Sequence, residues 1–140
     1  MRLNKTAQRA AILEELRSVT CHPTADELYT MLRKKMPQIS LGTVYRNLEQ
    51  LSELGIIQKI STSGTQKRFD GNVEFHHHMR CRECGRVVDM DDPALAELNE
   101  AFARVLPRVQ CEGFRLEFVG RCQECRANAG LNGENDSCAL

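Results

Sequence analysis

The sequence contains no run of about eighteen apolar residues, so no segment is predicted to span a membrane as a helix. Its first ten residues, MRLNKTAQRA, also lack the apolar stretch of a secretory signal. These two absences predict a cytoplasmic protein that does not associate with a membrane. Disulfide bonds are rare in a reducing compartment, so paired cysteines among the seven in the chain are expected to be metal ligands instead.

The chain also lacks net charge, which by itself neither favours nor excludes nucleic acid as a partner. The charges are unevenly distributed, however. Residues 1–68 contain 11 Lys and Arg against 6 Asp and Glu, whereas residues 69–140 contain 8 against 13. The basic first half is therefore the part that we expect to bind a polyanion.

The first half has the pattern of three helices. Apolar residues at helical spacing predict a helix over residues 6–19, and Thr24 with Glu27 forms a capping box that opens a second helix. Ser40 caps a third helix, which Gly55 is placed to end. The apolar stripe of this third helix consists of Leu41, Val44, Leu48, Leu51 and Leu54.

Residues 56–60 and 66–70 predict two strands joined by a short loop, which completes a winged helix-turn-helix. The third helix has hydrogen-bonding side chains on its outward face, near the end that enters the major groove in such folds. An isolated polar face is more often only solvated. The helix order, the cap and the basic hairpin together favour double-stranded operator DNA as the partner. The expected DNA contacts are Thr43, Tyr45, Arg46 and Asn47.

The second half predicts a small α/β lobe, with a strand over residues 86–90, a helix over 93–106 and a strand over 114–120. In the last strand, Phe114, Leu116 and Phe118 are expected to face inward. So small a sheet under one helix leaves apolar surface uncovered, which predicts a homodimer.

The predicted fold class is therefore α+β, an N-terminal winged helix-turn-helix followed by a small α/β dimerisation domain. The expected parts are a DNA-binding domain (1–70), a hinge (71–75), a dimerisation and metal-binding domain (76–126) and a disordered tail (127–140).

Two Cys-x-x-C pairs lie in the second lobe. Four thiolates suit tetrahedral zinc, and each pair can hold one side of the ion from a tight turn. The segment between the pairs is longer than usual, but the predicted strands and helix fit there as an insert. Redox disulfides and unrelated buried thiols are the alternatives. We predict a structural zinc site made by Cys81, Cys84, Cys122 and Cys125.

Three consecutive histidines precede the first of these pairs. Side chains alternate along an extended segment, so His76 and His78 share a face while His77 points the other way. The four-cysteine site needs no further ligand, so the two histidines indicate a second metal site. Its remaining ligands must come from elsewhere in the chain. His22, Asp70 and Asp89 are available, but their spacing alone does not select them.

Five separated segments, HPTADELY, TVYRNLEQLSELGII, KRFD, HHHMRCRECGRVVDM and RCQEC, resemble the ferric uptake regulator (Fur) superfamily, and most of all its peroxide-sensing branch. They occur in order over nearly the whole chain up to Cys125. The resemblance implies a metal-dependent transcriptional repressor. Its regulatory site would consist of His22, Asp70, His76, His78 and Asp89. The iron-responsive branch typically has glutamates where this chain has the two aspartates.

Three imidazoles and two carboxylates are harder ligands than four thiolates and suit Fe(II) or Mn(II). In the peroxide-sensing branch, bound iron reacts with hydrogen peroxide, which is a signal and not a substrate. A ligating histidine is oxidised, and DNA is released. By resemblance the oxidised residue would be His22 or His76. Manganese in the same site would support DNA binding but react poorly.

The chain departs from the Fur pattern at positions 75 and 77, which often supply ligands to an additional site. Phe75 cannot be a ligand, and we expect His77 to be an exposed residue that binds no metal. The remaining cysteines, Cys21, Cys111 and Cys138, are assigned no role.

Two other functions are compatible with these residues. An iron- or zinc-responsive repressor without peroxide chemistry shares the fold and differs in what the second site detects. A small metalloenzyme also begins with histidine and aspartate ligands and an open position. The zinc-deaminase signature and a general base beside the histidines are absent from the sequence, so we expect no enzymatic activity.

Overall fold

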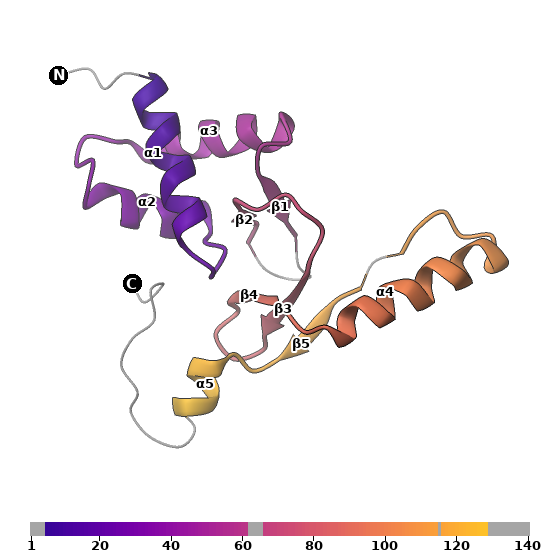
Figure 1. The fold of residues 1–140 in the computed structure, drawn as a ribbon. Coiled ribbons are helices and arrows are strands. Elements are labelled where there is room, and N and C mark those ends of the chain that lie inside the picture. The colour runs from indigo at the N-terminus through magenta and orange to yellow at the C-terminus, as the bar shows by residue number, and fades with distance from the viewer. Residues whose placement is uncertain (1–4, 62–65, 115, 129–140) are drawn as a thin grey trace.

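The computed structural model describes residues 5–61, 66–114 and 116–128. The chain forms two lobes joined by an extended segment (Figure 1). We call residues 5–70 the helical lobe and residues 76–128 the sheet lobe. The predicted α+β class and the helix-turn-helix followed by a hairpin are confirmed. No helix in the described part of the chain is both long and apolar enough to cross a membrane.

The helical lobe contains the three predicted helices. Thr24 caps the second with a complete capping box, since its Oγ1 accepts from the Glu27 N–H at 3.2 Å and Glu27 Oε2 accepts from the Thr24 N–H at 3.0 Å. Ser40 caps the third helix through the Thr43 N–H, and Gly55 turns the chain with a φ of 72°. The helices are α1 (Lys5–Ser18), α2 (Ala25–Arg33) and α3 (Leu41–Glu53).

One hydrophobic core unites α1, α2 and α3 with the hairpin. Leu54 was expected on the apolar stripe of α3, but it is 64% exposed. The prediction was wrong because α3 ends at Glu53 and the turn at Gly55 directs the chain back toward the core only at Ile57. The core consists of Ile12, Leu16, Ala25, Leu28, Leu32, Ile39, Val44, Leu48, Leu51, Ile57 and Phe69.

The hairpin, or wing, pairs β1 (Gln58–Ile60) with β2 (Arg68–Asp70) in antiparallel register. Both strands lie within the predicted segments but are shorter, and residues 62–65 of the expected loop fall outside the described residues. Strand β2 also contacts the segment before α2. The Phe69 N–H donates to the Pro23 carbonyl at 3.0 Å, and Thr24 forms a β-bridge with Arg68. The wing is therefore fixed to the start of α2.

The sheet lobe has the strand order β4-β3-β5, with β3 antiparallel to β4 and parallel to β5. The predicted strand over 86–90 and helix over 93–106 are confirmed, and they lie between the two cysteine pairs as an insert. The elements are β3 (His77–Cys81), β4 (Val87–Met90), α4 (Ala94–Val105), a 3-10 turn (Leu106–Val109), β5 (Phe118–Gly120) and α5 (Gln123–Asn128).

Two expectations for the sheet lobe were wrong. The last strand covers only Phe118–Gly120, and Phe114 and Leu116 are exposed because they precede it; Phe114 stacks on Phe102 with ring centroids 4.4 Å apart. Helix α5 extends through Asn128, so the first residues of the expected disordered tail are helical, and residues 129–140 lie outside the described part.

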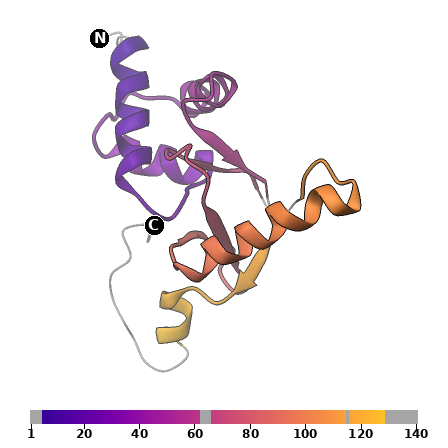
Figure 2. The same ribbon diagram turned by 45° about the vertical axis from the view of Figure 1, so that its right-hand side comes forward.

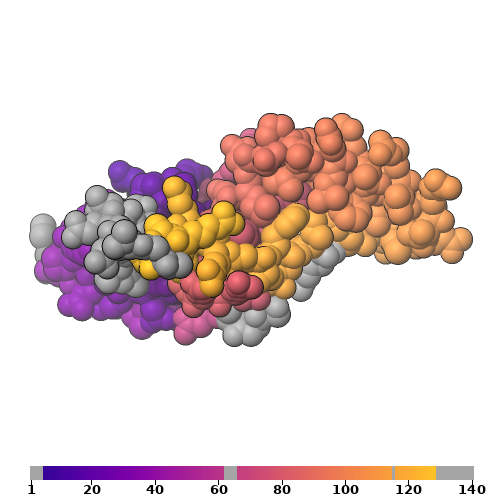
Figure 3. Space-filling model, turned by 90° about the horizontal axis from the view of Figure 1, so that it is seen from below, coloured from indigo at the N-terminus to yellow at the C-terminus, as the bar shows by residue number. Residues whose placement is uncertain are grey.

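Helix α4 carries an apolar face that the described residues cover only in part. It projects to the side of the sheet lobe, away from the three N-terminal helices (Figure 2), and with the segment after it forms one end of an elongated molecule (Figure 3). None of its described residues is buried. The large apolar side chains exposed in this lobe are Val105, Val109, Phe114, Leu116 and Val119.

Candidate metal centres

The four cysteines of the two Cys-x-x-C pairs meet at one end of the sheet lobe. Cys81 ends β3 and Cys84 lies in the turn that follows, while Cys122 precedes α5 and Cys125 lies within it. Their sulfur atoms all lie within 4.8 Å of one another, and the Sγ atoms of Cys84 and Cys122 are 3.8 Å apart. Zinc–sulfur bonds of about 2.3 Å place the corners of a tetrahedron about 3.8 Å apart. The four sulfurs therefore fit zinc.

Local hydrogen bonds shape this site. Gly85 adopts a φ of 75° and its N–H donates to the Cys81 carbonyl at 2.9 Å, which closes the first turn. The Arg86 guanidinium donates to the Glu124 carboxylate at 2.5 Å and ties that turn to α5. The sequence therefore builds each half of the site locally, and an ion pair joins the halves.

The close approach of the four sulfurs also changes the pKa values of the cysteines. Burial by itself raises the pKa of Cys81, but backbone N–H groups, among them those of Cys84 and Cys122, lower it to about 6. The hydrogen bond with Cys122 raises the pKa of Cys125, with burial and other thiols adding to the effect. Four thiolates this close repel one another unless a cation sits between them. Thiolate is the form that binds zinc.

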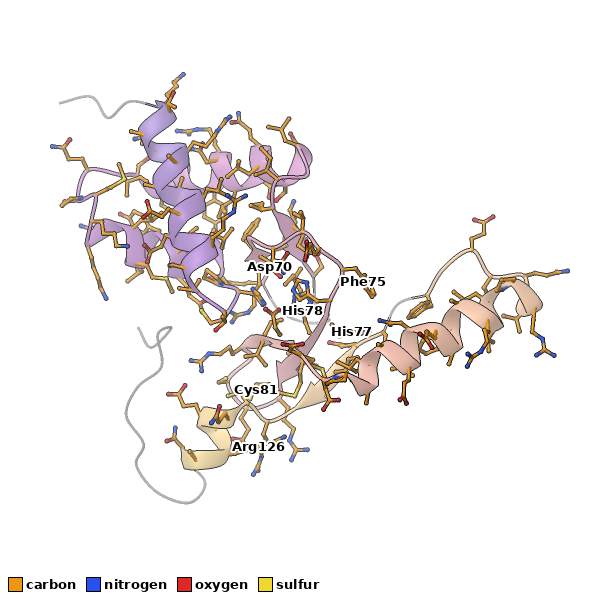
Figure 4. The ribbon with its side chains drawn as sticks, in the orientation of Figure 1. Asp70, Phe75, His77, His78, Cys81 and Arg126 are labelled. Atoms are coloured by element: carbon orange, nitrogen blue, oxygen red, sulfur yellow. The ribbon has the colours of Figure 1, made fainter. Side chains whose placement is uncertain are left out.

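The second cluster gathers side chains from both lobes. His22 comes from the turn before α2 and Asp70 from the end of β2, whereas Asp89 lies on β4 directly opposite His78 on β3. Figure 4 shows Asp70 of the helical lobe facing His78, with Cys81 at the far end of β3. One ligand atom from each of these residues and from His76 lies within 4.8 Å of all the others. The structure thus brings together all five residues that the resemblance implied.

In this cluster one oxygen of each carboxylate lies close to at least two imidazole nitrogens. Asp70 Oδ2 lies 2.7 Å from His76 Nε2 and 3.0 Å from His78 Nε2. Asp89 Oδ1 lies 2.7 Å from His22 Nε2 and 2.8 Å from His76 Nε2. Three imidazoles and two carboxylates that converge in this way could hold a divalent cation such as Fe(II) or Mn(II).

Neighbouring groups orient these side chains. The Nδ1 atom of His76 lies 2.6 Å from the Glu74 carbonyl, which leaves Nε2 for the cluster, and the Asn72 N–H donates to Asp70 Oδ1 at 2.8 Å. Burial lowers the pKa of His22 despite the two carboxylates beside it. Burial by itself raises the pKa of Asp70, but hydrogen bonds from His78 and the Asn72 N–H lower it overall. Neutral imidazole and ionised carboxylate are the forms that bind metal.

His77 points away from the cluster, as the alternation predicted, but it is 8% exposed and not a surface residue. Its Nε2 lies 2.8 Å from Asn99 Oδ1 on α4, and its ring packs edge-on against Phe75 and Phe118 at 5.3 and 5.5 Å. The expectation of exposure was wrong because α4 provides a hydrogen-bond partner for His77 and the neighbouring aromatic rings help to cover it. Phe75 is 76% exposed and offers no ligand atom.

The residues expected to contact DNA lie in the N-terminal half of α3. Tyr45 and Arg46 are exposed, whereas Thr43 and Asn47 are half-buried. The Tyr45 hydroxyl donates to Asp26 on α2 at 2.9 Å, and this hydrogen bond raises the pKa of Tyr45. Arg46 Nη2 donates to Thr43 Oγ1 at 3.2 Å. Hydrogen bonds within α3 and to α2 therefore hold some of these side chains in place.

Sequence reasoning missed one residue at this face. Arg9 on α1 donates from Nη2 to Gln50 Oε1 at 2.6 Å and from Nε to Asn47 Oδ1 at 3.4 Å. It thus braces two polar side chains of α3. Only the packing of α1 against α3 reveals the contact, since Arg9 lies far away in the sequence.

Replacing Arg46 by alanine should weaken operator binding. If the guanidinium reads a base, the loss should be about 1 to 3 kcal/mol and base discrimination should relax at one position. If it contacts phosphate, the loss of affinity should be nearly uniform across sequences. The slope of log affinity against log salt concentration should then become shallower by about one. Fluorescence anisotropy over a range of salt concentrations distinguishes these results. Unchanged affinity and unchanged salt slope would remove Arg46 from the interface.

The fold and the two ligand clusters together define a metal-binding winged-helix protein. The sequence pattern of the ferric uptake regulator family matches residues 1–118. The chain therefore belongs to the ferric uptake regulator family.

Individual relatives cover most of the chain. The peroxide-responsive repressor PerR of Staphylococcus epidermidis is 39% identical over 121 residues, which are 86% of this chain and 80% of that protein. The structure of the Campylobacter jejuni peroxide stress regulator matches with a TM-score of 0.67 and 31% identity, over 86% of this chain and 90% of that one. The Helicobacter pylori ferric uptake regulator Fur, with three functional metal-binding sites, matches with a TM-score of 0.71 and 25% identity, over 90% and 83% of the chains. These relatives are regulators and not enzymes.

Proposed function

We propose that this chain is a transcriptional repressor that binds operator DNA as a homodimer and senses hydrogen peroxide through Fe(II) at the second cluster. The main observation in support of the proposal is that the five clustered side chains come from both lobes. Two come from the helical lobe and three from the sheet lobe. The similarity to a peroxide-responsive repressor and to a peroxide stress regulator supports peroxide as the signal.

The clustered residues would control the relation between the lobes. His22 and Asp70 are fixed to the start of α2 and to the wing, whereas His78 and Asp89 are paired across β3 and β4. Holding all of them together selects one position of α3 relative to the sheet lobe. A dimer must present its two recognition helices at a fixed spacing on DNA, so this selection would set operator affinity.

The two clusters would have separate roles. Zinc held by the four cysteines would join β3 to α5 and keep the sheet lobe folded. Fe(II) at the second cluster would supply the electron that reduces peroxide and so leads to oxidation of His22 or His76, whereas Mn(II) would support DNA binding without ready reaction. Loss of His22 as a ligand would leave Asp70 as the one clustered side chain from the helical lobe, so that lobe would be held less firmly.

The surface of the sheet lobe supports the homodimer. Val105, Val109 and Val119 are exposed, and no described residue of α4 is buried. A second copy would cover this surface, as a small sheet with one helix requires. A repressor of this kind acts on DNA, which places it in the cytoplasm in this proposal.

The decisive experiment compares the Fe(II) and Mn(II) forms on an operator selected from a pool of random duplexes. Both forms should bind, and peroxide should release only the iron form, with one oxygen atom added to the peptide of His22 or His76 by mass spectrometry. If the iron form stays on DNA with both histidines unmodified, ligand oxidation is wrong. The protein would then be an iron-responsive repressor without peroxide chemistry.

Replacing Asp89 by glutamate should separate repression from sensing. The carboxylate is kept, but its arm is longer by one methylene, which changes where the oxygen lies relative to His22 and His76. We expect the variant to bind DNA with iron but to respond poorly to peroxide in the same assay. A variant that is released by peroxide as fast as the wild type would show that Asp89 does not tune the reaction.

A further inference from the structure

His22 has an unusual backbone. Its φ of 47° lies in the left-handed region, which residues other than glycine rarely adopt, and Pro23 follows it directly. The residue is also 3% exposed and directs its imidazole into the second cluster. Such a conformation persists only when neighbouring groups hold it. The contacts around the His22 backbone therefore decide how well the imidazole is positioned.

Arg68 provides a side-chain contact to the backbone of this turn. Its Nη1 donates to the His22 carbonyl at 3.2 Å and to Glu27 Oε2 at 3.0 Å. The Arg68 side chain is largely buried. The same Glu27 oxygen accepts from the Thr24 N–H in the capping box of α2. One guanidinium group therefore joins the strained turn to the first turn of the helix.

Arg68 and Asp70 approach His22 from the same strand. Residues two apart on β2 share a face, so both side chains point toward the turn. Asp70 Oδ1 lies 3.5 Å from His22 Nδ1, while Arg68 holds the carbonyl of the same residue. Between them, the Phe69 N–H donates to the Pro23 carbonyl at 3.0 Å. Strand β2 thus contacts the ring and the backbone of His22 and the proline after it.

We propose that Arg68 is a positioning residue for the second cluster. It holds the His22 turn in its left-handed conformation and connects the cluster to the wing and to α2. The inference rests on the proposed function, because His22 must act as a metal ligand. An imidazole that is already oriented binds metal more tightly than one on a mobile turn, since less ordering is required on binding.

The test uses the full-length, zinc-loaded protein and its Arg68→Gln, Arg68→Lys and Lys67→Gln variants. Mn²⁺ titration gives the affinity of the second cluster, and the visible spectrum of added Co²⁺ reports its geometry. We expect Arg68→Gln to bind Mn²⁺ about tenfold more weakly or worse and to change the Co²⁺ spectrum. Arg68→Lys keeps one donor group and should recover part of the affinity. Lys67→Gln removes a neighbouring exposed charge and should match the wild type.

Equal Mn²⁺ affinity and equal spectra in wild type and a folded Arg68→Gln would overturn the inference while leaving the proposed function intact. A wild-type protein that binds no Mn²⁺ beyond its zinc would overturn both. Should Arg68→Gln lose its circular dichroism spectrum, Glu27→Gln decides instead. Glutamine preserves the capping box but loses the charge that holds Arg68. Weaker Mn²⁺ binding in that variant supports the inference, and unchanged binding overturns it.

Discussion

Replacing Cys81 or Cys122 by serine should abolish zinc binding and unfold the sheet lobe. Both side chains are buried, and their site joins the end of β3 to the start of α5. The lobe has little other core, since no described residue of α4 is buried. Structural zinc contributes about 10 to 16 kcal/mol of apparent binding free energy in small zinc domains, which exceeds the stability of most single domains. Zinc content, circular dichroism and size-exclusion chromatography measure the result.

Cys111→Ser is the matched control for this experiment. Cys111 is exposed and does not belong to the four-cysteine cluster, so its replacement should leave zinc content and fold unchanged. A Cys81→Ser protein that remains folded, keeps its oligomeric state and retains one zinc per chain would contradict the structural role of the site.

His76→Ala and His78→Ala should each abolish metal-dependent operator binding. The Nε2 atoms of both residues contact Asp70 Oδ2, and each removal leaves four of the five clustered side chains. With fewer ligands the cluster should bind metal more weakly. The metal would then no longer fix the helical lobe relative to the sheet lobe. The expected result is loss of the Mn²⁺-dependent gel shift, while zinc content and helical circular dichroism stay at wild-type levels.

His77→Ala tests the same tripeptide on its other face. Its imidazole bonds to Asn99 and not to the cluster, so metal-dependent operator binding should be nearly intact. The variant should be less stable by about 1 to 3 kcal/mol, because the half-buried Asn99 loses its hydrogen bond and the buried ring of His77 is removed. A thermal melt measures this loss. Abolished operator binding in a folded His77→Ala protein would contradict the division of the tripeptide into two faces.

The helices of the first lobe could be predicted because their signals are local. The reciprocal capping box of Thr24 and Glu27 needs only four consecutive residues, and Ser40 and Gly55 mark the two ends of α3 within their own turns. Leu54 shows the limit of this reasoning, because periodicity continues past the residue at which the helix ends. The exposed position of that side chain follows from the turn and not from the helical pattern.

The clusters were predictable to different degrees. The alternation of His76 and His78 and the spacing of the cysteine pairs are properties of short segments. The approach of His22, Asp70 and Asp89 depends on how β2 docks on the turn before α2 and how β4 pairs with β3. Without the family resemblance, no local rule selects those three residues. The partners of His77, Arg9 and Arg68 were missed for the same reason.

The origin of the second cluster in both lobes has a thermodynamic consequence. If metal favours the arrangement of lobes that fits the operator, the operator must favour metal binding by the same factor, because the coupling free energy is shared. A repressor molecule on DNA would then release its metal more slowly or bind it more tightly than a free one. The metal concentration at which a gene is repressed would thus depend on operator affinity as well as on the ligands themselves.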